Sequence, residues 1–145
     1  MNILEVMLAR NLDVPEAEMI MNDIACYLTM CDSIALDMCK LKISKNDAYQ
    51  AIDMLAKALA IEVSGANESG DKIKVDTDDI YFYCIHPMLH KYTKTVIDAA
   101  LTDKYTNHDE EKLEPIVKES TRIIEDYIGT NAYRSGKYAA AVPVQ

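Results

Sequence analysis

The chain has 145 residues, of which half are apolar and only four are glycine and four proline. A chain of this length fits one domain and can bury a hydrophobic core that is stable without disulfide bonds or bound metal ions. So few glycines and prolines favour long helices over many short strands. The net charge of −9 at pH 7 offers no basic field to a nucleic acid or an anionic membrane. We therefore expect one all-α domain over residues 1–145 that binds neither nucleic acid nor membrane.

Residues 2–12 predict a short helix with one apolar side, and Asp13 is expected to cap the helix that follows it. Pro15 in the first turn and Glu16 three residues after the cap complete the start signal. From Pro15 to Ile43, apolar residues recur at alternating spacings of three and four, which is typical of the seam of a heptad repeat. The seam consists of Ala17, Ile20, Ile24, Tyr27, Cys31, Ile34, Met38 and Leu41. This central helix would be roughly 42 Å long.

A second apolar row lies beside the seam, and further apolar side chains lie off it. The opposite face, which includes Asp32, is expected to stay in water, so that Asp32→Ala should be near neutral. The apolar surface is wider than one layer of neighbouring helices would cover. We therefore predict a homo-oligomer that associates through this helix, with an interface formed by Met21, Leu28, Met30, Ala35 and Leu36.

The chain after the central helix contains a second capping signal and then a polar stretch. Ser44 followed by Asp47 opens a helix from Lys45 to about Val63. Residues 64–75 are polar and contain glycine, which predicts a loop. Residues 72–75 within it alternate like a strand, but so short a segment without a partner does not make a sheet.

Two more helices complete the predicted bundle. Asp76 is expected to cap the first, in which Pro87 removes a backbone donor, so that this helix is kinked or split there. The last helix is expected to begin near Asn107 or at Pro115 and to end at Gly129. The sequence thus predicts a bundle of about five helices, followed by a C-terminal tail over 130–145.

The four cysteines match neither a zinc or redox motif nor the framework of a disulfide-rich secreted protein. We expect reduced, buried thiols that act as small hydrophobic side chains at Cys26, Cys31, Cys39 and Cys84. The N-terminus lacks the pattern of a signal peptide, and no uncharged apolar run reaches the length of about 18 residues that a membrane span requires. We therefore expect a cytoplasmic protein.

The strongest chemical signal is the pair His86 and His90. On a helix these residues lie one turn apart on one face, which lets two imidazoles bind one metal ion. A stable metal site needs three or four ligands, and the sequence offers no Glu-x-x-His pair of the di-iron kind. A hydrogen-bonded or exposed pair is therefore favoured and no cofactor is predicted, while a divalent metal or a small polar ligand remains the alternative.

Asp23 and Asp37 flank the seam, as carboxylates do in helical metal-dependent pyrophosphohydrolases, but the paired motifs of those enzymes are absent. A solvated face explains both better. No nucleophile motif, phosphate loop or dinucleotide fingerprint occurs. The favoured function is a non-enzymatic oligomeric or protein-interaction bundle. The alternative is a metal- or small-ligand-binding bundle centred on His86 and His90, which leaves enzyme activity open.

Two stretches suggest relatives: the long helix from Pro15 to Ile43 with its cysteines and methionines, and the residues from Val75 to Cys84. Through them the whole chain resembles small uncharacterised helical-bundle proteins from archaea. The resemblance implies an oligomeric bundle and no catalytic residues.

Overall fold

The computed structural model describes residues 1–65, 76–106 and 110–129. These residues are all-α, as predicted, with helices α1 (Ile3–Ala9), α2 (Val14–Cys39), α3 (Lys45–Ser64), α4 (Thr77–Ile80), α5 (His86–Thr106) and α6 (Glu110–Ile128) and a π-helical turn η1 (Tyr81–Ile85). Because α4, η1 and α5 follow one another without a break, the described part of the chain forms five rods. Most of the predicted 64–75 loop, including residues 72–75, and the 130–145 tail lie outside the described residues.

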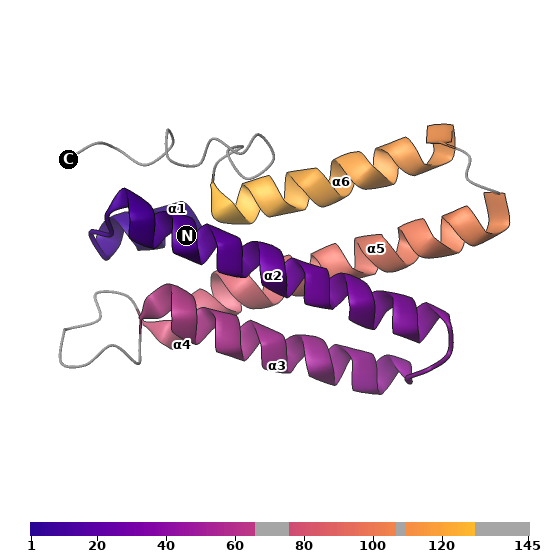
Figure 1. Ribbon diagram of the computed structural model, residues 1–145, viewed down its shortest axis with the longest axis horizontal. Coiled ribbons are helices and arrows are strands. Elements are labelled where there is room, and N and C mark those ends of the chain that lie inside the picture. The colour runs from indigo at the N-terminus through magenta and orange to yellow at the C-terminus, as the bar shows by residue number, and fades with distance from the viewer. Residues whose placement is uncertain (66–75, 107–109, 130–145) are drawn as a thin grey trace.

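The helices pack as two antiparallel pairs. Helices α2 and α3 form one pair, and α5 and α6 form the other (Figure 1). Helix α5 also contacts both α2 and α3 and so joins the pairs, whereas α6 packs mainly on α5. The short helix α1 contacts α3 and α6.

The helix starts read from the sequence are confirmed in atomic detail. The Glu16 N–H donates to Oδ1 of Asp13 at 2.9 Å, and the Asp13 N–H donates to Oε2 of Glu16 at 3.0 Å, which is a complete capping box. The Asp47 N–H donates to Oγ of Ser44 at 3.0 Å at the start of α3. The side chain of Asp76 likewise caps α4.

Helix α2 ends at Cys39, short of the predicted Ile43. Leu41 adopts a left-handed conformation with φ of 61°, and its N–H donates to the Met38 carbonyl, so that the chain turns away from the helix axis. The prediction that Leu41 belongs to the buried seam was therefore wrong, and its side chain is 91% exposed.

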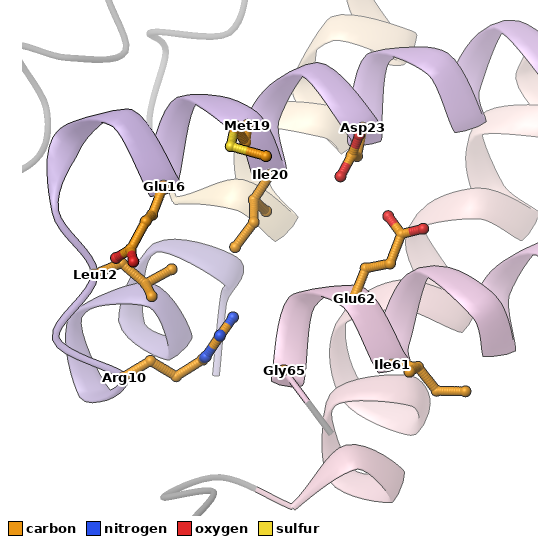
Figure 2. A pocket seen from close by; sticks show the side chains of 9 residues that line it. All are labelled: Arg10, Leu12, Glu16, Met19, Ile20, Asp23, Ile61, Glu62 and Gly65. Atoms are coloured by element: carbon orange, nitrogen blue, oxygen red, sulfur yellow. The ribbon is translucent and has the colours of Figure 1, made fainter. Parts of the chain in front are cut away.

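Helix α1 is attached to the end of α3 by a side chain. Arg10 Nη1 donates to the Val63 carbonyl at 2.8 Å, which satisfies one of the carbonyls that a helix end leaves free. Gly65, with φ of 70°, caps α3 next to this guanidinium (Figure 2). The positive φ favours glycine at this position, and a Cβ there would lie 2.3 Å from Nη2 of Arg10, so that the guanidinium would also have to move.

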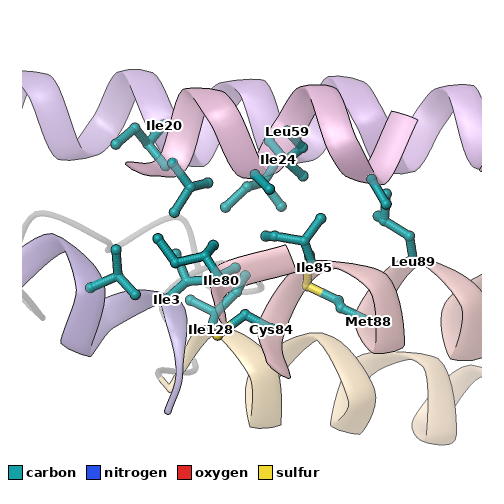
Figure 3. Close-up of a cluster of buried hydrophobic side chains, with 14 of the residues drawn as sticks. Ile3, Ile20, Ile24, Leu59, Ile80, Cys84, Ile85, Met88, Leu89 and Ile128 are labelled. Atoms are coloured by element: carbon teal, nitrogen blue, oxygen red, sulfur yellow. The ribbon is translucent and has the colours of Figure 1, made fainter. Parts of the chain in front are cut away.

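The hydrophobic core gathers side chains from all the rods (Figure 3). The seam prediction is confirmed for its inner positions, since Ala17, Ile24 and Cys31 are fully buried. Opposite them lie the largest fully buried side chains of the other elements: Ile3, Leu59, Ile80, Ile85, Met88, Leu89 and Ile128. At about 1.5–3 kcal/mol for each large apolar side chain, this burial is the main source of stability.

The cysteine prediction holds for only part of the set. Cys31 and Cys84 are buried, and burial raises the pKa of both thiols to about 11. Cys26, however, is exposed and Cys39 is half-buried, because both lie on the outer side of α2, away from the core. All four thiols are free.

One described helix, α2, has the length and mean hydropathy that a membrane crossing would require. The core helix of a bundle meets the same two criteria, and α2 supplies Ile24 and Cys31 to the core. The expectation of a chain without a membrane span therefore stays a prediction.

Candidate metal centre

The structure adds a third residue to the predicted histidine pair. Asp53 of α3 lies against His86 and His90 of α5, and one ligand atom from each lies within 4.8 Å of the others. Nε2 of His86 is 3.9 Å from Oδ1 of Asp53. The two imidazoles stack with their centroids 4.0 Å apart. Two imidazoles and a carboxylate thus converge on one half-exposed point between two helices.

The register of α3 against α5 produces this convergence. The two helices run antiparallel, so two residues of α3 that are four positions apart lie opposite two residues of α5 with the same spacing. Asp53 contacts His86, and Tyr49 stacks on His90 with ring centroids 5.6 Å apart. Both pairs exploit the one-turn spacing that places side chains on a common helix face. The sequence showed each spacing separately, but it did not show which turn of α3 lies opposite which turn of α5.

The π-helical turn brings in Tyr81. The His86 N–H bonds to the Tyr81 carbonyl, five residues back, and the Tyr81 ring meets the His86 ring edge-on at 5.4 Å. In an α-helix, side chains five apart point about 140° away from each other, so only the wider turn allows this contact. The turn ends at Ile85, two residues before Pro87. The predicted interruption at this proline thus takes the form of a π-helical turn, and the helix does not split.

Asp53 is held in its ionised form by its neighbours. The Tyr81 hydroxyl donates to Oδ1 of Asp53, and Lys57 Nζ lies 3.3 Å from Oδ2. These contacts, with the hydrogen bond from Tyr81 as the largest, lower the pKa of Asp53 although burial acts in the opposite direction. Burial, followed by the same hydrogen bond, raises the pKa of Tyr81 to about 12. The carboxylate is therefore charged and oriented.

His90 is held in its neutral form. Burial, and then the proximity of His86, lower the pKa of its imidazole, and the charge of Asp53 opposes this only in part. Its Nε2 atom is buried and has no hydrogen-bond partner among the described residues. A buried, unpaired ring nitrogen carries a free-energy penalty unless it accepts a bond. A metal ion is one electron-pair acceptor that would satisfy it.

The donor set fits a small divalent transition metal. Zn²⁺ binds imidazole nitrogen and carboxylate oxygen at about 2.0–2.2 Å, so tetrahedral ligand atoms lie roughly 3.4 Å apart. From their present spacing of at most 4.8 Å, the ligand atoms of this cluster would close by up to about 1.4 Å, which side-chain rotation can provide. Three protein donors would leave at least one coordination position to solvent, as in catalytic rather than structural zinc sites.

The predicted interface residues divide into two groups. Met21, Leu28 and Ala35 are buried within the chain itself, so their assignment to an interface was wrong: they fill the space between α2 and its own neighbouring helices. Met30 and Leu36 are 46% and 42% exposed. Only these two remain available to a second copy.

No family model, no curated protein and no solved structure matches this chain. The resemblance to archaeal helical-bundle proteins therefore stays a prediction.

Proposed function

We propose that this protein binds a divalent transition metal ion through Asp53, His86 and His90. The observation that carries the proposal is the convergence of these three side chains from two helices, with Nε2 of His90 buried and unpaired. An oriented carboxylate and a neutral imidazole are the protonation states that ligate metals at neutral pH. The open coordination position would allow the ion to bind a water or a small substrate.

The test is a Co²⁺ titration of protein purified without a metal-affinity tag, followed by visible absorption and elemental analysis. One equivalent of Co²⁺ or Zn²⁺ should bind to the wild type. His86→Ala, His90→Ala and Asp53→Asn should each weaken binding by at least about tenfold, because loss of even an outer partner of a metal ligand costs roughly 10–100-fold.

His108→Ala provides the matched control. His108 is the third and last histidine of the chain and lies outside the described residues. If His108→Ala weakened Co²⁺ binding as much as His90→Ala, or if the wild type bound no stoichiometric metal, the proposed site would be wrong.

A second candidate function is self-association through the outer face of α2. From Asn22 to Leu36 every exposed side chain of this helix is uncharged, and Met30 and Leu36 lie among them. An uncharged face of this length is unusual on a surface rich in carboxylates. It supports the homo-oligomer expected from the sequence, although with a smaller interface.

Sedimentation velocity tests this second function. Met30→Asp combined with Leu36→Asp should shift an oligomer to a monomer. Met54→Asp, on an exposed position of α3, should not. A wild type that sediments as a monomer at micromolar concentration would exclude this function without affecting the metal site.

A further inference from the structure

A groove between α2 and α3 lies apart from the residues of the metal cluster. Its apolar wall is made by Leu12, Met19, Ile20 and Ile61 (Figure 2). Its cavity volume of about 280 Å³ is just below the roughly 300–1,000 Å³ of ordinary small-molecule pockets. A space of this size suits one or two inserted side chains better than a cofactor.

The apolar surface continues beyond the groove. Ile61 also lines a second hollow of about 480 Å³, which reaches Phe82 of η1. Met19 and Phe82 are 66% and 65% exposed. Exposed apolar side chains from α2, α3 and η1 thus line two hollows that share Ile61, and a contiguous apolar surface of this kind marks a protein-interaction site.

The charges around the groove are mainly negative. Glu16 and Asp23 of α2 and Glu62 of α3 line it, and among the described residues Arg10 is the only basic one that does. The Arg10 guanidinium already donates to the Val63 carbonyl. In the second hollow, Asp78 is accompanied by Lys57, which pairs with Asp53 at 3.3 Å. Both basic residues are therefore engaged by the chain itself.

Two of the carboxylates face each other across the groove. Figure 2 shows the side chains of Asp23 and Glu62 pointing toward one another from opposite helices. Burial, then the charge of Asp23 and a hydrogen bond between the two carboxyl groups, raise the pKa of Glu62, against a hydrogen bond from Tyr27. A cation placed beside this pair would stabilise both groups in their ionised forms.

We propose that this groove docks a basic amphipathic helix of another protein. An apolar side chain of that helix enters between Met19 and Ile61, and a lysine or arginine lies beside the Asp23 and Glu62 pair. Helix-in-groove recognition uses this combination of apolar anchors and flanking charge. A second copy of the same chain is the weaker occupant of this groove, because an acidic rim favours a basic ligand and this chain carries 24 acidic against 15 basic residues.

The probe for the test is a labelled peptide of about five helical turns, roughly 18 residues, with leucine along one face and lysine along its flanks. Fluorescence anisotropy should show binding to the wild type that weakens as salt rises. The double variant Asp23→Asn/Glu62→Gln should weaken binding about tenfold or more, which corresponds to about 1.4 kcal/mol. Met19→Ser/Phe82→Ser should also weaken it, and because both positions are exposed the fold should persist, as circular dichroism will verify.

The matched control is Glu18→Gln/Asp98→Asn, which changes the net charge equally at two exposed carboxylates outside the groove. This variant should change the affinity less than about twofold. Equal weakening by both carboxylate variants would overturn the proposal in favour of general attraction to an acidic protein. Absence of binding to the wild type would overturn it as well, and so would a change in the chain's own sedimentation caused by the groove variants, which would assign the groove to a second copy.

Discussion

The Tyr92 hydroxyl donates a hydrogen bond of 2.8 Å to Oδ1 of Asp32, and this bond links α5 to α2. The sequence pattern predicted that Asp32 would be exposed to solvent, but its carboxylate is half-buried. Burial raises the pKa of Asp32, although the hydrogen bond from Tyr92 acts in the opposite direction. Asp32 lies beside the seam residue Cys31, at the edge where α5 covers α2. The bond therefore contributes to the packing of the two helix pairs.

Asp32→Ala should lower the free energy of unfolding by about 1 kcal/mol, because it leaves the Tyr92 hydroxyl without this acceptor. This replaces the near-neutral effect expected from the sequence. Urea unfolding measures the change, and Ser33→Ala, at the exposed neighbouring position, is the control with an expected change within about 0.5 kcal/mol. Equal effects of the two substitutions would show that the bond contributes nothing measurable.

Ile24→Asp should unfold the protein or lower its stability by about 4 kcal/mol or more, since it places an unpaired carboxylate at a fully buried position. Ile34→Asp should have a smaller effect, because Ile34 is only partly buried. Thermal and urea unfolding followed by circular dichroism compare the two variants. A stable Ile24→Asp variant would contradict the core described above.

Leu41→Gly should raise the free energy of unfolding by about 0.5–1 kcal/mol. The left-handed conformation of Leu41 is unfavourable for a side chain with a Cβ, and glycine adopts it freely. Leu41→Ala is the matched control, because it removes the exposed side chain but keeps the backbone penalty. The prediction fails if alanine stabilises the protein as much as glycine does.

Stability should decline as the pH rises between about 10 and 12. Burial, followed by the hydrogen bond to Glu62, raises the pKa of Tyr27 from 10.0 to about 12, and the pKa of Tyr81 also rises to about 12. Above pH 10 the unfolded chain loses these protons first, so ionisation favours unfolding, whereas below pH 10 both tyrosines keep their protons in either state.

Tyr27→Phe should make this alkaline decline shallower, and Tyr27→Phe/Tyr81→Phe should flatten it further. Urea unfolding of the three proteins at several pH values provides the comparison. An unchanged slope in the double variant would show that other groups cause the alkaline loss.

The local features of this chain were predictable from residue spacing alone. The caps at Asp13, Ser44 and Asp76 and the buried seam positions of α2 depend on contacts between residues three or four apart, and such contacts are encoded in spacing. The one-turn spacing of His86 and His90 belongs to the same class. The end of α2 was missed because leucine gives no local signal for the left-handed conformation found at Leu41.

Which helix faces meet depends on how the helices pack and was not predictable from the sequence. Asp53 joins the histidines because of the axial register between α3 and α5, and Tyr81 joins because a π-helical turn alters the side-chain spacing. The burial of Met21, Leu28 and Ala35 likewise depends on how closely neighbouring helices cover α2. Periodicity shows that a helix has an apolar face, but it does not show which neighbour covers that face, because packing depends on distances between residues far apart in the chain.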